Sequence, residues 1–238
     1  MFRKKRSTIY TIEIEGIEVE VTRKSIKNLY VRVNRRNGKV RVSCPLRISE
    51  KHLTRFIASK LSWIKKQKEK TTLIKPERAL QYLSGEKHLF MGKEYFLVVK
   101  KGDSKSNVFL EKDSLIMQIR GKDTLEKRTK LLDEWYRAHL KEMIQELIRK
   151  YEPIMDVKVL EFGVKKMKTR WGTCNIKDQR IWLNLELAKK SFDCLEMVVV
   201  HEMVHLLERL HNKRFYFLMD KFMPEWRKAN TKLNSFID

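Results

Sequence analysis

The sequence predicts an α+β protein with a β-rich N-terminal part, into which a helix is inserted, followed by a mainly helical C-terminal part. Two observations carry this prediction. Before residue 120, apolar and polar residues alternate along several short segments, which is the period of a half-buried strand. From residue 123 onward, apolar residues recur at three- and four-residue steps, which is the period of a helix that faces a core. We therefore expect a boundary near residue 122, between a β-rich part, residues 1–122, and a C-terminal domain, residues 123–238.

The N-terminal part begins with strands. Four are expected, at residues 9–15, 17–22, 29–33 and 40–44. Asn37 and Gly38, between the last two strands, are a residue pair favoured in a two-residue type I′ turn. Ser49 is placed to cap a helix that continues to about Lys70, because the apolar residues of this segment recur on one face. A second strand-rich stretch follows at residues 81–119, punctuated by glycines.

The C-terminal domain begins with a long helix, expected from Asp123 to about Pro153. Short strands are expected at residues 157–162 and 180–185. Ser191 is placed to cap a further helix, and the helical segments beyond it are broken at Pro224. We recognise no internal repeat in the sequence.

Composition limits the class of protein. The 238 residues are 42% hydrophobic, which is enough to bury a core although 35% are charged. The chain has three cysteines, Cys44, Cys174 and Cys194, and no two of them form a Cys-x-x-Cys pair. They are too few to build a disulfide framework, so a reducing compartment is expected. The basic segment Met1–Arg6 is not followed by the apolar run of a signal peptide, and no stretch has the roughly 20 apolar residues of a membrane span. We therefore expect a cytoplasmic protein without a membrane segment.

The candidate site is an H-E-x-x-H sequence, residues 201–205, within an apolar helical run. Side chains four residues apart lie about 40° apart around a helix, so His201 and His205 can bind one Zn²⁺ ion. Glu202 is the next residue along the helix after His201 and can act as general base on a water bound to zinc. This combination of a zinc ion and a base is typical of enzymes that hydrolyse peptide bonds. The alternative is a pair of core histidines satisfied by hydrogen bonds, but such polar groups are costly in a buried helix without a partner.

A catalytic zinc usually has a third protein ligand, and the spacing leaves two candidates. His211 lies ten residues after His201, about 280° around an ideal helix, so the chain must turn between Leu206 and Leu210. Glu225, on a following helix, is the alternative. The spacing alone favours His211 without excluding Glu225.

Two features that precede the H-E-x-x-H sequence each allow a functional and a purely structural interpretation. The strand at residues 180–185 would offer an edge along which an extended peptide substrate binds, or it is an ordinary core strand. Cys194 lies seven residues before His201 and therefore on nearly the same helix face. We expect Cys194, like Cys174, to be a structural thiol and not a metal ligand.

Several blocks of sequence occur together in one order. They are Thr22–Ile26, Ser59–Ile64, Tyr82–Glu86, Leu89–Lys93, Met167–Cys174, Leu183–Asn184, His201–His205 and His211–Phe215. This ordered set resembles the YgjP-like metallopeptidases, which are similar to the SprT and Spartan group of zincins. The resemblance implies a zincin-like metallopeptidase core after a β-rich N-terminal part, and it implies that His211 is the third ligand. Thr173, Leu210 and Tyr216 depart from the usual residues of the family, but none of them is a ligand or the base.

Positive charge is concentrated near the N-terminus. The formal net charge is +23, and residues 1–70 hold 20 Lys and Arg against 6 Asp and Glu. Such an excess can bind phosphates, and Trp63, Tyr30 and Tyr82 can offer stacking surfaces for bases. A solvated basic surface with no such partner is the alternative.

Two functions of different classes follow from the sequence. The first is a zinc-dependent metallopeptidase that acts on a protein or peptide and is recruited by its basic N-terminal part to nucleic acid or to acidic protein segments. The second is a non-catalytic module that binds nucleic acid or protein and contains a structural zinc. Glu202 favours the enzyme, because structural zinc is usually closed by four protein ligands, often cysteines. The sequence makes no prediction of the oligomeric state.

Overall fold

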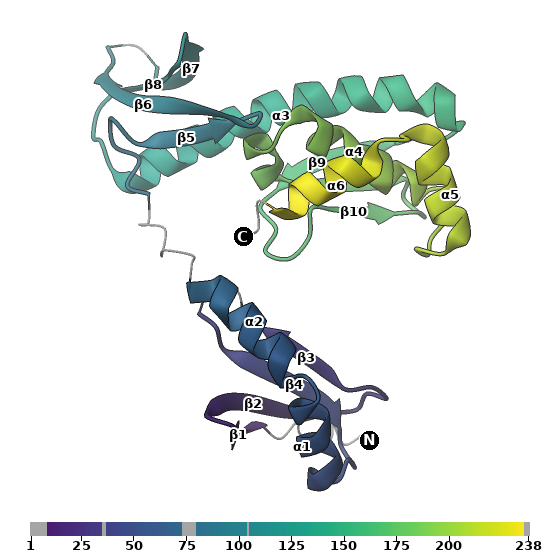
Figure 1. Ribbon diagram of the computed structural model, residues 1–238. Coiled ribbons are helices and arrows are strands. Elements are labelled where there is room, and N and C mark those ends of the chain that lie inside the picture. The colour runs from purple at the N-terminus through teal and green to yellow at the C-terminus, as the bar shows by residue number, and fades with distance from the viewer. Residues whose placement is uncertain (1–8, 35–36, 73–79, 104, 236–238) are drawn as a thin grey trace, which may run out of the picture. The chain divides into compact units, whose positions relative to one another are not determined.

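The computed structural model describes residues 9–34, 37–72, 80–103 and 105–235, so the basic segment Met1–Arg6 lies outside the described residues. The chain divides into two compact units, with the boundary between Arg78 and Ala79 (Figure 1). Each unit has its own hydrophobic core. A mixed α+β architecture is therefore confirmed, with several separate sheets.

The first unit is built on a four-stranded sheet. Its strands are β1 (Ile9–Ile14), β2 (Ile17–Lys24), β3 (Tyr30–Val33) and β4 (Val40–Pro45), in the order β1-β2-β4-β3. All four lie where the alternating pattern predicts strands. The connection between β3 and β4 is longer than the expected two-residue turn, because Val33 and Val40 are the last paired residues. Gly38, at φ 66°, helps to close this loop by donating its N–H to the Asn34 carbonyl at 2.8 Å.

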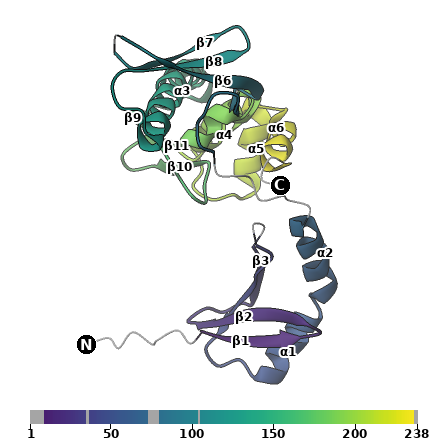
Figure 2. The same ribbon diagram turned by 90° about the vertical axis from the view of Figure 1, so that its left-hand side faces the viewer.

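Two helices cover one face of this sheet (Figure 2), α1 (Glu50–Ala58) and α2 (Leu61–Thr72). Ser49 caps α1 as predicted, since its hydroxyl accepts a hydrogen bond from the His52 N–H at 3.3 Å. The single helix expected as far as Lys70 is interrupted after α1. There the Ser59 hydroxyl donates to the Phe56 carbonyl at 2.7 Å, a local bond of the kind that competes with helix continuation. The buried residues of the two helices and the sheet are Ile17, Val19, Val21, Val40, Val42, Cys44, Leu53, Ile57, Leu61 and Ile64.

The second unit begins with another four-stranded sheet, which packs against the long helix α3 (Leu125–Met155). Its strands are β5 (Lys87–Phe90), β6 (Lys93–Lys101), β7 (Asn107–Glu111) and β8 (Ser114–Ile119). Leu97 and Leu115 share one core with Leu140 of α3, and the Tyr136 hydroxyl of α3 donates to the Leu89 carbonyl at 2.7 Å. Because these strands share their core with α3, the boundary lies between residues 78 and 79 and not near residue 122.

The two four-stranded sheets have the same topology. The second has the order β5-β6-β8-β7, and in both sheets the two central strands are parallel while the outer pairs are antiparallel. In both, the first hairpin has a two-residue turn with positive φ at each position, at Glu15 and Gly16 (47° and 73°) and at Met91 and Gly92 (48° and 79°). The structure thus repeats an arrangement that we did not recognise in the sequence.

A three-stranded sheet follows α3, in the order β10-β11-β9. Its strands are β9 (Glu161–Lys165), β10 (Gly172–Asn175) and β11 (Arg180–Asn184). β9 begins later than the strand expected at residues 157–162, because Glu152 at the end of α3 binds the preceding segment. Its carbonyl accepts the Val157 N–H at 3.2 Å, and its carboxylate accepts the Val159 N–H at 2.9 Å. α3 itself continues through Pro153 and ends where Asp156 adopts φ 53°.

The remaining elements are a short 3₁₀ helix, η1 (Leu185–Lys189), and the helices α4 (Phe192–Val204), α5 (Lys213–Phe222) and α6 (Trp226–Ser235). α4 packs against α3, α5 and α6 (Figure 2), and the expected break at Pro224 separates the last two. Ser191 occupies the N-cap position of α4 as predicted, but its hydroxyl makes no capping bond and lies 3.4 Å from the Cys194 sulfur. In the described part of the chain, no helix combines the length and the apolar character that crossing a membrane requires.

The β5–β6 turn contacts the start of α4. The Met91 N–H donates to the Ala188 carbonyl at 2.8 Å. A Cβ added at Gly92 would lie 3.2 Å from Ser191, so a side chain there would be crowded as well as strained by the positive φ. This turn therefore holds the segment from which α4 begins.

Truncation of Leu140 tests the core that joins α3 to the sheets. Leu140 is fully buried, and Leu140→Ala is expected to lower the free energy of unfolding by about 2–5 kcal/mol. Leu125→Ala is the matched control, because Leu125 begins the same helix and is 41% exposed. Urea unfolding followed by far-ultraviolet circular dichroism measures both variants. Equal losses in the two variants would contradict the proposed core.

Candidate metal centre

α4 brings most of the candidate site into the core. Cys194, Leu195, Val198, Val199, Val200, Met203 and Val204 are buried on all sides of this helix. His201 and Glu202 occupy its last turn, and His205 is the residue at which it ends. Apart from Asp193 and Glu196 in its first half, which pair with Lys232 and Lys150, the helix carries polar side chains only in its last turn.

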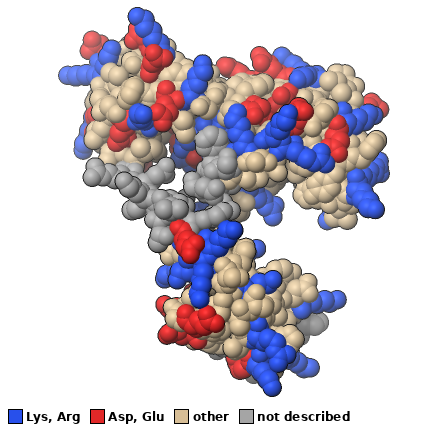
Figure 3. Space-filling view, viewed as in Figure 1, with Lys and Arg blue, Asp and Glu red and all other residues tan. Residues whose placement is uncertain are grey.

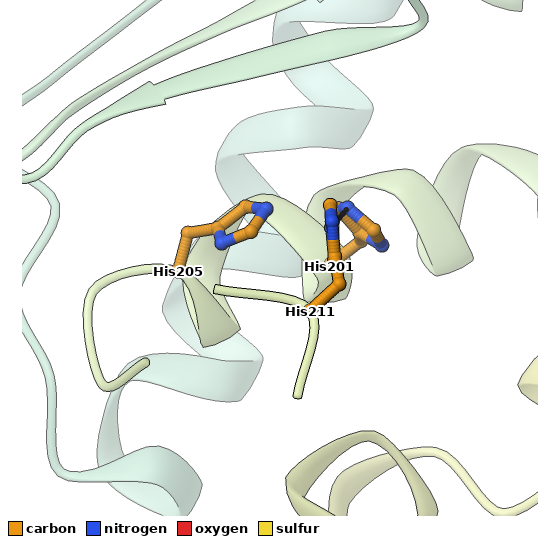
Figure 4. A group of neighbouring side chains, drawn as sticks. All are labelled: His201, His205 and His211. Atoms are coloured by element: carbon orange, nitrogen blue, oxygen red, sulfur yellow. Dashed lines mark hydrogen bonds between the residues drawn. The ribbon is translucent and has the colours of Figure 1, made fainter. Parts of the chain in front are cut away.

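Three histidine rings converge beyond this helix end (Figure 4). One ligand nitrogen from each of His201, His205 and His211 lies within 4.8 Å of the other two, and the Nε2 atoms of His201 and His211 are 3.0 Å apart. Nitrogens bound about 2.0–2.1 Å from a tetrahedral zinc ion lie about 3.3 Å from one another. The separation between His201 and His211 is close to this value, and the other two separations are at most 4.8 Å, so small side-chain movements would complete a three-histidine zinc site.

The chain returns to the site through a tight turn after α4. The N–H groups of Leu206, Leu207 and Glu208 donate to carbonyls at the end of the helix, at 2.9–3.0 Å. The Glu208 carboxylate then accepts the Leu210 N–H at 3.1 Å. None of residues 205–212 has a positive φ, so the turn needs no glycine. This is how the ring of His211 reaches the site despite its position around an ideal helix.

Glu225, the alternative third ligand, is not part of this cluster. Among the described residues, the side chains grouped closely enough to hold one metal ion are those of His201, His205 and His211. Glu225 lies between α5 and α6, where its carboxylate pairs with Lys228. The geometry favours His211.

Phe215 forms the support on which the three imidazoles rest. Its ring is 1% exposed, and its centroid lies 4.9, 4.8 and 4.6 Å from those of His201, His205 and His211. Asn212 caps α5 by accepting the Phe215 N–H at 3.0 Å, which fixes the start of the helix that carries this ring. Phe215 appears in the sequence only as one more apolar residue, so its contact with all three rings could not be deduced there.

The protonation of the imidazoles suits a metal. The His205 Nδ1 lies 3.1 Å from the Glu208 carbonyl oxygen, which can only accept, so this nitrogen carries the proton and the Nε2 lone pair is available. Burial lowers the pKa of His201 to about 4, with smaller contributions from His205 and His211, and burial also lowers the pKa of His205. Both rings are therefore neutral at pH 7, as zinc ligands must be.

Glu202 is buried beside the histidines, against the first residue of β10. It is 5% exposed, and burial raises the pKa of its carboxyl to about 8 although the nearby positive charge of Arg170 opposes the rise. A Cβ added at Gly172 would lie 2.5 Å from the Glu202 Oε1, so only glycine lets β10 approach this carboxylate so closely. The H-E-x-x-H pattern identifies Glu202 in the sequence, whereas no sequence pattern indicates that Gly172 contacts its carboxylate.

A cleft with a volume of about 1120 Å³ opens beside these groups. It is lined by the three histidines and Glu202, by residues 170–177, and by Met197, Val198, Arg209, Asn230 and Leu233. β10 is the edge strand of its sheet, whereas β11 lies between β10 and β9. The expectation that residues 180–185 offer a free edge is therefore wrong, since both sides of β11 are paired.

The two cysteines of this unit differ in position. Cys174 lines the cleft, and burial, together with the charge of Glu202, raises the pKa of its thiol to about 11, so that it stays protonated at neutral pH. Cys194 is fully buried, with its sulfur 3.6 Å from the Ala229 carbonyl. Neither joins the three-histidine cluster.

A family model described as "YgjP-like, metallopeptidase domain" matches residues 27–236. The chain belongs to the YgjP-like family. The match covers most of the chain and confirms the resemblance found in the sequence, and it identifies the protein as a member of a metallopeptidase family. No curated protein matches the chain.

Two solved structures with a partial likeness to the chain are those of metallopeptidase zymogens. They are the zymogens of Pyrococcus abyssi abylysin and of Methanocaldococcus jannaschii jannalysin, each 15% identical to this YgjP-like chain with a TM-score of 0.36. The likeness covers 39% of this chain and 92% of abylysin, and 42% of this chain and 97% of jannalysin.

Metal content tests the choice of third ligand. We expect about one zinc ion per chain in the wild-type protein purified without chelators, and loss of the stoichiometric metal in His211→Ala. Glu225→Ala is the matched control and is expected to keep the metal, because Glu225 lies outside the cluster. Elemental analysis of the three proteins gives the result. Retention of zinc by His211→Ala together with its loss from Glu225→Ala would assign the third ligand to Glu225.

Proposed function

We propose that this YgjP-like protein is a zinc-dependent metallopeptidase in which His201, His205 and His211 bind zinc and Glu202 is the general base. The observation that carries the proposal is the convergence of three imidazoles next to one buried carboxylate, in a cleft open to substrate. Zinc bound there would polarise a peptide carbonyl and lower the pKa of water to about 7. The core of the second unit is, on this proposal, zincin-like, with the H-E-x-x-H residues at the end of α4.

Glu202 has a defined task in this reaction. With a pKa of about 8, its carboxyl is mostly protonated at pH 7 in the absence of metal, and the positive charge of a bound zinc ion would favour the carboxylate. The carboxylate would then take the proton of the attacking water and deliver it to the nitrogen of the departing amine as the peptide C–N bond breaks. Its burial keeps bulk water away from this transfer, and Gly172 leaves room for the carboxylate to face the cleft. The phenyl ring of Phe215 holds the three imidazoles while this happens.

The substrate is proposed to be a protein or peptide in extended conformation. β10 pairs with β11 on one side, and residues of β10 line the cleft beside Glu202. An extended peptide can add to such an edge through backbone hydrogen bonds, with its scissile carbonyl toward the histidines. β10 thus takes the role that sequence analysis considered for residues 180–185.

The alternative, a non-catalytic module with a structural zinc, is less well supported. A structural zinc site is usually closed by four protein ligands, whereas this cluster offers three among the described residues. A structural site also has no use for a buried carboxylate beside its first ligand. The observations therefore favour turnover.

The first unit is proposed to recruit the enzyme to nucleic acid. Lys60, Trp63 and Lys66 are exposed at three-residue steps along the start of α2, and Trp63 is 43% exposed. Figure 3 shows Lys and Arg side chains gathered over this helix. Tyr30, 51% exposed on the sheet, offers a second ring, but Tyr82 belongs to the second unit and packs against the His88 ring at 5.3 Å. A basic surface with exposed aromatic rings suits single-stranded nucleic acid.

Replacement of the base tests the mechanism. Glu202→Gln is expected to keep about one zinc per chain and to lower kcat for a denatured protein substrate by at least about 100-fold, because the amide cannot accept the proton. Glu225→Gln is the control and is expected to keep wild-type activity. Elemental analysis and the appearance of new peptide amines are measured together. Wild-type turnover by the Glu202 variant would refute the mechanism.

Binding to a labelled single-stranded oligonucleotide tests recruitment. We expect fluorescence anisotropy to show an affinity that falls steeply with salt, and a loss of about 5-fold or more in Trp63→Ala, since one stacked base contributes about 1–3 kcal/mol. Lys66→Glu should weaken binding and flatten the salt dependence. Lys101→Glu, an exposed charge reversal in the second unit, is the control and should change neither. Absence of binding by the wild type at low salt would reject recruitment.

A further inference from the structure

Asn184, the last residue of β11, is a buried side chain that the proposed reaction does not use. It is 4% exposed. Its Nδ2 donates to the carbonyls of Met167 and Arg170 at 3.0 and 2.8 Å, and its Oδ1 accepts the N–H groups of Met167 and Glu186 at 3.2 Å each. Its backbone N–H donates to the Trp171 carbonyl at 2.8 Å. One asparagine therefore satisfies polar backbone groups at both ends of the segment 167–171.

This segment, which we call the Arg170 loop, connects β9 to β10 and forms one wall of the cleft. Arg170 lines the cleft together with His201 and Glu202. Its side chain is exposed, while its backbone carbonyl is one of the groups that Asn184 holds. The guanidinium lies near enough to Glu202 for its charge to act on that carboxylate. The anchor is thus buried, and the arginine that it holds lines the space for substrate.

A guanidinium at this place has a use in peptide hydrolysis. Attack on the carbonyl carbon moves negative charge onto the carbonyl oxygen, and fixed donors that meet this charge lower the barrier. Arginine offers several N–H donors with a permanent charge, so its effect on the carbonyl oxygen depends on where the backbone of Arg170 is held. The loop has no regular secondary structure that would fix this backbone, and the hydrogen bonds to Asn184 fix it instead.

We propose that Asn184 is a positioning residue of the peptidase site, which fixes the Arg170 loop so that the Arg170 guanidinium meets the oxygen of the scissile carbonyl. The inference rests on the proposed function and adds a named pair of residues to it. Asn184 is not among the residues that line the cleft, so its effect on substrate must pass through the loop. Arg170 is then the group that touches substrate.

Hydrogen exchange measures the restraint without any activity. In the zinc-loaded protein, peptides that cover residues 167–171 should exchange at least about 10-fold faster in Asn184→Ala than in the wild type, because the loop loses three side-chain hydrogen bonds. Asn184→Asp is a gentler variant that keeps the accepted bonds and loses the two donated ones, and it should show the same change in a smaller degree. Peptides from α3 report whether each variant is folded.

Asn175→Ala is the matched control for exchange. Asn175 also caps a loop through its side chain, at the other end of β10, where its Oδ1 accepts the N–H groups of Lys177 and Asp178 at 3.1 and 3.2 Å. Its replacement should accelerate exchange at residues 176–179 and leave residues 167–171 unchanged. Unchanged exchange of residues 167–171 in both Asn184 variants would overturn the proposal.

A double-mutant cycle separates positioning from general weakening. Arg170→Ala and Asn184→Ala should each lower kcat/KM by about 100-fold, mainly through kcat, while zinc content stays at the wild-type level. The double variant should fall no more than about threefold below Arg170→Ala, because the loop has no further use once the guanidinium is gone. A loss in the double variant equal to the product of the single losses would overturn the proposal. Absence of hydrolysis by the wild type would instead refute the proposed function, and the positioning role with it.

Discussion

The site depends above all on the burial of α4. A helix with buried apolar side chains around most of its circumference can be stable only when other elements enclose it, and α3, α5, α6 and the β10–β11 sheet do so. The same exclusion of water sets the chemistry at the end of the helix. Burial favours the neutral forms of His201 and Glu202, so it makes His201 a good ligand and holds the carboxyl of Glu202 at a high pKa. Stability and reactivity therefore have one physical origin in this helix.

The sequence predicted those parts of the fold that depend on local pattern. The strands of the first unit follow from the alternation of residues such as Val19 and Glu20, and the H-E-x-x-H spacing predicted that His201 and His205 share a face. The third ligand could not be fixed by spacing, because the path from α4 to His211 depends on a turn closed by the Glu208 carboxylate. The helix after Ser49 was too long in the prediction, because the apolar pattern continues through Ser59, where the hydroxyl bonds to the Phe56 carbonyl and α1 ends.

Long-range contacts explain what sequence reasoning missed. No local pattern gives Gly172 or Phe215 a place in the site. Folding brings Gly172 against Glu202 and Phe215 against the three imidazoles. The boundary expected near residue 122 follows a real change from strand to helix pattern, but the strands before it share their core with α3. A change from strands to helices along the chain therefore does not mark a domain boundary when the elements on both sides of the change pack into one core.

The repeated sheet topology places the same turn in two different surroundings. The two four-stranded sheets share their strand order, their strand directions and a first turn with positive φ at both positions. In the second unit the turn at Met91 and Gly92 contacts the segment from which α4 begins, whereas in the first unit a Cβ at Gly16 would meet nothing within 4 Å. A side chain at Gly92 is therefore disfavoured both by backbone strain and by crowding, but at Gly16 by the positive φ alone.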